Sequence, residues 1–283
     1  MASHESCVWL NGLLLPSAQA RISPWDVAFT VGCGAFETLR AYGGVPFAIT
    51  RHWHRLERSC AVLGLRPPTL EQFASAMSET LNANKLHEAR VRFTVSGGES
   101  QPGQVSPDGD TVFVCTAIPS ATTKEQEAVV MSPWPRNERG ALAGAKSVSY
   151  AENVVALTHA RRAGGGEAIF ANTQGDLCEG SATNVFLVRD GLLHTPPLSS
   201  GCLAGVTREL TLEVCRAHGI PISEKSLPAT ALAGAEEAFL TSSMREVQAI
   251  ASVDGTPLSK TVGPLTRRVA GLFREFVSSN ADP

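Results

Sequence analysis

The segment from Gly34 to Tyr42 constrains the fold more than any other part of the chain, because its apolar and polar residues alternate and it runs directly into Gly43-Gly44. Alternation with a period of two is typical of a half-buried β-strand, and a pair of glycines permits the tight turn of a hairpin. Val8-Trp9-Leu10 ends in the same way, at an Asn-Gly turn. Both segments are therefore predicted to be hairpin strands.

Helices are predicted between the strands of this first part of the chain. Apolar residues recur at helical spacing from His52 to Leu63 and from Leu70 to Leu81, and Thr69 can cap the second helix. Further strands are expected over residues 90–95 and 111–115, joined by a loop rich in glycine, proline and serine. The mixture predicts a small α+β domain that covers residues 1–119.

A second domain is predicted over residues 133–283, after an interdomain linker at residues 120–132 that begins with a polar, threonine-rich stretch. Helices are expected at residues 150–163, which end at a run of glycines, and at 207–217, where Gly219 follows as a C-terminal cap. Strands are expected at residues 168–170, 176–179, 184–188 and 238–240. The predicted fold class is therefore α+β with two domains.

Composition narrows the class of protein. With 283 residues, of which 43% are hydrophobic, the chain has enough apolar material for two cores. Its net charge of -3 arises from mixed signs without long blocks of one sign, which argues against nucleic acid or an anionic membrane as a partner. Its seven cysteines are scattered singly without a Cys-x-x-Cys pair, so we expect reduced thiols and no metal site. The N-terminus has no signal-peptide pattern and no apolar run approaches the about 18 residues of a membrane span, so a cytoplasmic protein is expected.

Lys146 is the candidate nucleophile, because it alone among the lysines has mostly small or apolar neighbours, in Gly144-Ala145-Lys146-Ser147-Val148. A lysine that is kept from water has a lowered pKa and can act as a nucleophile. A lysine beside small residues is nevertheless more often a surface group, so Lys146 gains weight only together with the features that follow it.

Further features would complete a site around such a lysine. Glu179 stands at the end of a predicted strand, where its carboxylate can hold a cation or be an exposed acid in a hairpin loop. The segment from Gly201 to Arg208 leads into a helix, so its N–H groups form either a phosphate cradle or an ordinary helix start. The hydroxyls of Thr241-Ser242-Ser243 and the charge of Arg55 can add to the cradle. Pyridoxal phosphate needs a lysine for its aldehyde, a carboxylate for its pyridine nitrogen and N–H donors for its phosphate.

The order of these motifs resembles the class IV aminotransferases, which are also called fold-type IV pyridoxal-phosphate enzymes. The resemblance covers nearly the whole chain, from residue 8 to residue 255. It implies a small α/β sandwich domain, a larger pseudo-barrel domain with flanking helices, and an active site at the domain interface of a homodimer. The matching motifs are Phe36-Glu37-Thr38-Leu39-Arg40, His52-x-x-Arg55-Leu56, Lys146-Ser147-Val148-Ser149-Tyr150, Glu179-Gly180-x-x-x-Asn184-Val185-Phe186, Thr195-Pro196-Pro197, Gly205-Val206-Thr207-Arg208 and Thr241-Ser242-Ser243-x-x-Glu246-Val247.

The resemblance also implies a role for each matching residue. Lys146 would bind the aldehyde of pyridoxal phosphate and move the proton of the substrate, and Glu179 would pair with the pyridine nitrogen. Tyr150 would hydrogen-bond the phenolic oxygen of the cofactor. The phosphate would be held by Arg55, Val206, Thr207 and Ser243.

Three activities share these motifs: branched-chain aminotransferase, D-amino acid aminotransferase, and 4-amino-4-deoxychorismate lyase, which makes 4-aminobenzoate and pyruvate for folate. Branched-chain enzymes typically have tyrosine and glycine where this chain has Val31 and Thr38. The D-amino acid enzymes carry an Arg-x-His trap that the loop from Gly97 to Asp110 lacks. A hydroxyl residue such as Thr38 is similar to the lyases, so the sequence predicts the lyase and keeps the transaminases and a catalytically silent relative as alternatives.

The substrate of the lyase is a small amine with two carboxylates. Arg92 and Arg245 are the candidates to bind these carboxylates, although an arginine in such a setting more often lies at the surface. Phe36 and Ser242 are expected to line the same pocket, and Thr38 is expected to act in catalysis near the lysine.

Overall fold

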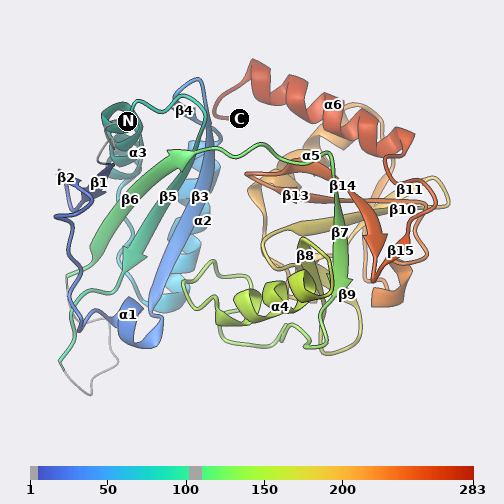
Figure 1. The fold of residues 1–283 in the computed structure, drawn as a ribbon, viewed down its shortest axis with the longest axis horizontal. Coiled ribbons are helices and arrows are strands. Elements are labelled where there is room, and N and C mark those ends of the chain that lie inside the picture. Colours follow the sequence, from blue (N-terminus) through green and yellow to red (C-terminus); the bar gives the residue numbers. More distant parts are fainter. Residues whose placement is uncertain (1–5, 102–109) are drawn as a thin grey trace. The chain divides into compact units, whose positions relative to one another are not determined.

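The computed structural model describes residues 6–101 and 110–283, and the chain divides into two compact units (Figure 1). The first unit contains the chain up to Ala121 together with Ala145–Ser149 and Ala281–Pro283. The second unit contains Thr122–Gly144 and Tyr150–Asn280. The chain leaves the first unit and returns to it, so neither unit is one continuous stretch of sequence.

The strands of the first unit are β1 (Cys7–Leu10), β2 (Leu13–Pro16), β3 (Gly34–Tyr42), β4 (Val45–Pro46), β5 (Ala89–Ser96) and β6 (Val112–Pro119). Among the described residues they form a six-stranded antiparallel sheet with the order β2-β1-β6-β5-β3-β4. Asn11 and Gly12 turn the first hairpin with φ angles of 47° and 91°, and Gly43 and Gly44 turn the second with 57° and 86°. Positive φ at both central residues matches the twist of the flanking strands, so the two predicted hairpins are confirmed.

The helices of the first unit are α1 (Val27–Val31), α2 (Ile49–Leu63) and α3 (Leu70–Asn84). The predicted cap of α3 is confirmed, because the Thr69 hydroxyl accepts from the Gln72 N–H and the Gln72 side chain accepts from the Thr69 N–H. Helices α2 and α3 bury the apolar face of the sheet. The largest side chains of this core include Leu39, Leu56, Phe73, Met77 and Phe93.

Helix α2 begins at Ile49 rather than at the predicted His52, because its first turn is capped from a distant part of the sequence. Its N-cap residue, Ala48, makes no side-chain hydrogen bond. The Asp282 carboxylate instead accepts from the Thr50 N–H at 2.9 Å and from the Thr50 hydroxyl at 2.6 Å. A cap that is distant in sequence cannot be recognised from the residues around the helix start.

The strands of the second unit are β7 (Gln126–Met131), β8 (Glu167–Ala171), β9 (Leu177–Gly180), β10 (Asn184–Arg189), β11 (Leu192–Thr195), β12 (Ile222–Glu224), β13 (Glu237–Ser242), β14 (Glu246–Val253) and β15 (Thr256–Pro257). They form a nine-stranded mixed sheet with the order β12-β11-β10-β13-β14-β7-β8-β9, and β15 pairs with β14. Strand β9, at one end of this order, contacts β10 near the other end, so the sheet curls back on itself. This curled sheet confirms the expected pseudo-barrel.

The helices of the second unit are α4 (Ala151–Arg162), α5 (Val206–Ala217) and α6 (Pro264–Ser279). Helices α5 and α6 pack with the rings of Phe186 and Phe239, whose centroids lie 4.8 Å apart. Gly219 follows α5 with a φ of 63°, as predicted. Within residues 6–101 and 110–283, no helix combines the length and the hydropathy that a membrane crossing requires.

The predicted linker is shorter than residues 120–132. Residues 120–125 have no regular structure, but β7 begins at Gln126 and pairs in parallel with β14 and β8. Polar residues begin β7, so the sequence pattern does not indicate a strand there, although Val129 and Val130 of this strand are buried. The segments Ala145–Ser149 and Ala281–Pro283, which the sequence assigns to the second domain, belong to the first unit. A single boundary in the sequence therefore does not describe the two units.

Candidate functional site

Lys146 lies in a short segment that runs beside β3. The Lys146 carbonyl accepts from the Phe36 N–H at 3.0 Å, and the Lys146 N–H donates to the Ser59 hydroxyl oxygen at 3.0 Å. The Val148 N–H donates to the Gly34 carbonyl at 2.8 Å, so the backbone is held on both sides of the lysine. The side chain is half-buried, and its Nζ lies 4.6 Å from the centroid of the Phe36 ring. The predicted nucleophile is thus presented from a well-anchored backbone against an aromatic face.

The Phe36 ring connects Lys146 with Arg92. Cζ of Arg92 lies 3.7 Å from the ring centroid, and its Nε donates to the Thr94 hydroxyl at 3.3 Å. Thr38 stands directly opposite Arg92 in the register of β3 and β5, so Phe36, Thr38 and Arg92 project from the same face of the sheet. The hydroxyl oxygen of Thr38 is buried and has no hydrogen-bond partner within the described part of the chain. The predicted substrate residues of the first unit therefore lie together.

A buried charge cluster lies on the opposite face of β3. Arg55, which is predicted to bind phosphate, points into the unit and donates to both Glu37 carboxylate oxygens, at 2.7 and 2.6 Å. His52 Nδ1 lies 2.7 Å from the same carboxylate. Burial alone would raise the pKa of the Glu37 carboxyl, but the Arg55 guanidinium and His52 lower this pKa to about 2, so Glu37 is ionised. Burial lowers the pKa of His52, so its imidazole is neutral and donates to Glu37.

Ser59 connects this charge cluster to the candidate nucleophile. Its hydroxyl donates to the Arg55 carbonyl at 3.0 Å and accepts from the Lys146 N–H. The sequence prediction gave no role to Ser59, Glu37 or His52. One feature of the sequence did indicate a role for Glu37. It lies at a position of an alternating strand that faces the core, where a carboxylate needs a partner.

Glu179 lies in β9 of the second unit and is 9% exposed, so it is not an exposed acid in a hairpin loop. Its Oε2 accepts from the Leu203 N–H at 2.9 Å, and its Oε1 lies 3.3 Å from Nε of Arg136. Arg136 in turn lies over the Phe170 ring, with Cζ 4.3 Å from the centroid. These contacts hold the carboxylate in one orientation. The sequence did not single out Arg136, which lies in an irregular segment without a recognisable pattern.

The N-terminus of α5 carries Val206 and Thr207, as predicted. Gly205 precedes them, and no side chain caps the helix. A Cβ at Gly205 would collide with the Asn184 amide, so this close approach requires glycine. Thr241 stands opposite Asn184 in the register of β10 and β13, and its buried hydroxyl has no hydrogen-bond partner among the described residues. Uncapped N–H groups and an unsatisfied hydroxyl on one side of the sheet can hold an anion.

Tyr150 and the Ser242-Ser243 turn also lie in the second unit. Tyr150 precedes α4, and its hydroxyl donates to the Ser181 carbonyl at 3.1 Å. Ser242 ends β13, and its hydroxyl accepts from the Arg245 N–H at 3.2 Å. Ser243 follows in the turn to β14. Both segments are therefore ordered by hydrogen bonds within the unit.

Arg245 is bound to other protein groups, which argues against its predicted role in the substrate pocket. Its Nη2 donates to the Glu167 carboxylate at 2.8 Å and to the Gly166 carbonyl at 3.2 Å, and its Nη1 donates to the Gln248 side chain at 2.5 Å. Glu127 adds a second carboxylate at 3.7 Å. Since two acidic groups neutralise Arg245, Arg92 is the better candidate for a substrate carboxylate.

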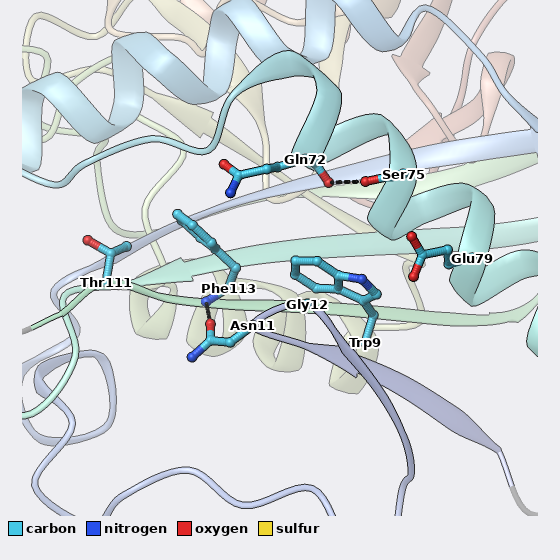
Figure 2. A pocket seen from close by; sticks show the side chains of 8 residues that line it. All are labelled: Trp9, Asn11, Gly12, Gln72, Ser75, Glu79, Thr111 and Phe113. Carbon is cyan, nitrogen blue, oxygen red and sulfur yellow. Dashed lines mark hydrogen bonds between the residues drawn. The ribbon is translucent and has the colours of Figure 1, made fainter.

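A surface hollow of about 400 Å³ lies in the first unit. Figure 2 shows Gln72, Ser75 and Glu79 of α3 on one side of it, with Trp9 and Phe113 on the other. None of the predicted site residues lines this hollow, so it is not the candidate site. Across residues 6–101 and 110–283, no group of three or more His, Cys, Asp or Glu side chains is placed to hold a metal ion.

Known proteins that are similar to the chain carry more than one activity. A protein-family model described as amino-transferase class IV matches residues 34–253. The chain is 30% identical over 276 residues to a putative branched-chain-amino-acid aminotransferase of Methanocaldococcus jannaschii, and the match covers 95% of this chain and 96% of that protein. It is 29% identical over 279 residues to the aminodeoxychorismate lyase of Bacillus subtilis, and this match covers 96% of this chain and 95% of that protein. The crystal structure of the branched-chain aminotransferase of Thermoproteus uzoniensis with norvaline matches with a TM-score of 0.89 at 32% identity, over 96% of this chain and 94% of that one.

Proposed function

The chain belongs to the class IV aminotransferase family, whose members are pyridoxal-phosphate-dependent enzymes, and on this premise we propose that it is a 4-amino-4-deoxychorismate lyase. The proposed reaction releases pyruvate and 4-aminobenzoate from a small amine with two carboxylates. Since the family includes transaminases as well, the choice depends on the substrate residues of this chain.

Each unit offers groups of the kind that pyridoxal phosphate needs. The second unit offers the buried Glu179 carboxylate, the uncapped start of α5 and the unpartnered Thr241 hydroxyl, and the first unit offers the half-buried Lys146. We propose that Lys146 binds the aldehyde, Glu179 the pyridine nitrogen and Tyr150 the phenolic oxygen. When bound, the cofactor supplies an electron sink for the carbanion that forms at the substrate. The proposed phosphate ligands are Val206, Thr207 and Ser243, together with Arg55, whose Nε and Nη2 also hold the Glu37 carboxylate.

Proton transfer at Lys146 is common to the possible reactions. Its Nζ is proposed to take the α-proton of the substrate, which a transaminase and a lyase both require. Lys146 therefore does not decide between the two reactions. The decision depends on the groups that surround the substrate.

The main support for the lyase is the buried hydroxyl of Thr38, which has no partner within residues 6–101 and 110–283. A buried polar group without a partner costs about 1–3 kcal/mol, so its presence favours a role toward a ligand. Thr38 shares its face of the sheet with Phe36, whose ring contacts both Lys146 and Arg92. A substrate at this face would meet a hydroxyl, a guanidinium and an amine.

Arg40 and Arg90 add positive charge to the same face. They stand directly opposite each other in the register of β3 and β5, and each lies two residues from Thr38 or Arg92 along its strand. Like charges in opposite positions destabilise a sheet. Glu88 lies 3.8 Å from Arg40 at the rim and is itself largely exposed. This concentration of positive charge suits a substrate with two carboxylates better than an amino acid with one.

Branched-chain transamination is the second candidate, because two of the similar proteins carry that name. Val31 and Thr38 weigh against it, since enzymes of that type typically have tyrosine and glycine there. Val31 is 49% exposed in this unit, and its aliphatic side chain has no hydroxyl to offer a substrate.

A parallel assay of one preparation distinguishes the candidates. The purified enzyme is given aminodeoxychorismate, L-leucine with 2-oxoglutarate, or D-alanine with 2-oxoglutarate, and 4-aminobenzoate, pyruvate and glutamate are measured. We expect equal amounts of pyruvate and 4-aminobenzoate from the first substrate and slow formation of glutamate from the others. Brisk transamination of L-leucine without lyase activity would reject the lyase in favour of the second candidate, and brisk transamination of D-alanine would instead indicate a D-amino acid transaminase.

We also propose that the protein is a cytoplasmic homodimer. All seven cysteines are free, which fits a reducing compartment. Leu13, Trp25, Phe29 and Val31 are exposed apolar residues of the first unit, and such residues are typical of interfaces. Light scattering should give twice the chain mass of 29.9 kDa, and Phe29→Asp should shift the mass toward the monomer. A monomeric wild-type protein would reject this proposal.

A further inference from the structure

We infer that the ion pair between Glu167 and Arg245 positions two cofactor-binding segments of the second unit at once. One segment is the end of β9 with Glu179, and the other is the β13–β14 turn with Ser243. Neither partner of the pair touches the cofactor in this inference, because both act through other groups. The inference rests on the proposed function for what these segments bind.

Glu167 is anchored to the segment that follows Glu179. It begins β8 and is 1% exposed. Its Oε1 accepts from the Ser181 hydroxyl at 2.5 Å and from the Ala182 N–H at 3.0 Å. Ser181 lies immediately beyond the end of β9, so the Glu167 carboxylate determines how the chain leaves the strand that holds Glu179.

Ser181 transmits this constraint to Tyr150. Its carbonyl accepts from the Tyr150 hydroxyl at 3.1 Å and from Nδ2 of Asn153 at 2.6 Å. Its N–H donates to the Ala168 carbonyl at 2.9 Å. Since the hydroxyl, the carbonyl and the N–H of Ser181 are all bound, a displacement of Ser181 would also move Tyr150.

Arg245 is anchored to the β13–β14 turn. Its backbone N–H donates to the Ser242 hydroxyl at 3.2 Å, and Ser243 lies between these two residues. Its guanidinium reaches Glu167 at 2.8 Å and the Gln248 side chain at 2.5 Å. The turn that carries Ser243 is therefore joined through one guanidinium to the carboxylate that holds Ser181.

Burial makes the pair sensitive to the loss of either partner. Burial raises the pKa of Glu167, and the charge of Arg245 opposes this rise. Without Arg245, the Glu167 carboxyl would hold a proton over a wider pH range and would lose the partner of its Oε2. Glu127, 3.7 Å from Arg245, would lose its cation as well. Loss of the arginine should therefore disturb both segments and not only the turn.

The variant Arg245→Met tests the inference, with Lys260→Met as the matched control. Lys260 makes an ion pair with Glu236 at 2.8 Å in the same unit, but on the surface. We expect Arg245→Met to weaken the binding of pyridoxal phosphate to the cofactor-free protein by about tenfold, as measured by an absorbance titration. It should also shift the pH midpoint of the visible band of the bound cofactor, because Tyr150 and Glu179 move. Lys260→Met should change neither quantity, and Arg245→Lys should restore part of the affinity.

Glu167→Gln and the double variant distinguish a coupled pair from two separate effects. If the residues act as a pair, Glu167→Gln combined with Arg245→Met binds the cofactor no more weakly than Arg245→Met alone. Additive losses in the double variant would overturn the inference. So would a wild-type affinity and an unshifted band in Arg245→Met.

Hydrogen exchange of the cofactor-free protein separates this inference from the proposed function. Arg245→Met should speed amide exchange at Gly180 and Ala182 as well as in the turn from Ser242 to Glu246. Faster exchange in the turn alone would refute the coupling. If the wild-type protein fails to bind pyridoxal phosphate, the proposed function is wrong, and the exchange experiment still decides whether the pair couples the two segments.

Discussion

The guanidinium of Arg92 lies over the ring of Phe36, with Cζ 3.7 Å from the ring centroid. Nζ of Lys146 contacts the same ring, at 4.6 Å from its centroid. A guanidinium that stacks on an aromatic ring directs its N–H groups outward in the plane of the stack, where a carboxylate can bind them side by side. Phe36 therefore holds Arg92 and Lys146 at one ring, which is the geometry on which the proposed role of Arg92 toward the substrate rests.

Replacement of this arginine tests its role toward the substrate. Arg92→Met should raise KM for aminodeoxychorismate by about tenfold and lower kcat less, because a carboxylate remote from the reacting carbon contributes mainly uniform binding. Steady-state release of pyruvate measures both constants. Arg66→Met, which removes an exposed arginine of the same unit, is the control. A lower kcat with an unchanged KM would place Arg92 in the chemical step instead.

Lys146→Ala should abolish the visible absorbance of the bound cofactor. It should lower turnover by on the order of a thousandfold or more, because covalent attachment and proton transfer both need the amine. The fold should persist, since the hydrogen bonds that anchor the segment use the backbone of Lys146. Circular dichroism and absorbance spectra check the two expectations, and the exposed Lys225 provides the control variant Lys225→Ala. Retained turnover would rule out the assignment of the nucleophile.

Glu179→Gln should lower turnover by on the order of a hundredfold or more, because an amide cannot pair with a protonated pyridine nitrogen as a carboxylate does. Initial rates at saturating cofactor measure the loss. The matched control is Glu152→Gln, because Glu152 also lies 3.3 Å from Arg136 but has a side chain that is 77% exposed. Equal losses in both variants would show that Glu179 serves Arg136 rather than the cofactor.

His52 should make the stability of the protein depend on pH. Its folded pKa is lowered by burial from the ordinary 6.5, so the unfolded chain binds this proton more tightly than the folded protein. The free energy of unfolding should therefore fall as the pH drops below 6.5, until the folded pKa is reached. Urea titrations between about pH 8 and about pH 5 measure this slope.

The control for this slope is on the same helix. His52→Asn should remove the histidine contribution, whereas His54→Asn, which changes an exposed neighbour, should retain it. A further loss of unfolding free energy is expected as the pH falls from 4.5 toward about 2. The folded pKa of Glu37 is lowered, so its ionised carboxylate stabilises the fold, and this contribution disappears as the carboxylate gains a proton in the folded protein. An unchanged slope in His52→Asn would contradict the assignment.

Asp282→Ala should lower the free energy of unfolding by about 1 kcal/mol, because the first turn of α2 loses its cap. Urea denaturation of wild type and variant measures the difference. Asp282→Asn is the matched control, since the amide oxygen can still accept from the Thr50 N–H. If both variants are as stable as the wild type, the contact of Asp282 with Thr50 does not stabilise the helix.

The parts of the fold that were predictable have local signals. Strand β3 and helix α3 begin where alternation and the Thr69 cap place them. Helix α6 was not predicted, although Pro264 starts it and Leu265, Val269 and Leu272 recur at helical spacing. Strands β7 and β14 were not predicted, because polar residues begin both. Each is stabilised by a neighbouring strand on either side in the sheet, and such pairing is not visible in the local sequence.

The sequence named candidate site residues but could not name the groups that they contact. Lys146 and Glu179 became candidates only through the order of the motifs along the chain, because the immediate neighbours of each also fit a surface group. The partner of Arg55 is Glu37 and the partner of Arg245 is Glu167, and both acids lie far from their arginines along the chain. The neighbours of an arginine do not reveal which carboxylate it meets in the fold, so Arg92 and Arg245 received the same proposed role from the sequence.

The return of the chain to the first unit has a consequence for protein synthesis. Most of that unit precedes residue 122, yet the backbone partner of Phe36 is in Ala145–Ser149 and the cap of α2 is Asp282. While a ribosome is still translating the second unit, the nascent first unit has a strand and a helix start whose N–H groups lack their final partners. The part of the protein that is made first is therefore completed late, and a chain that stops before Asp282 would lack a contact of its first unit.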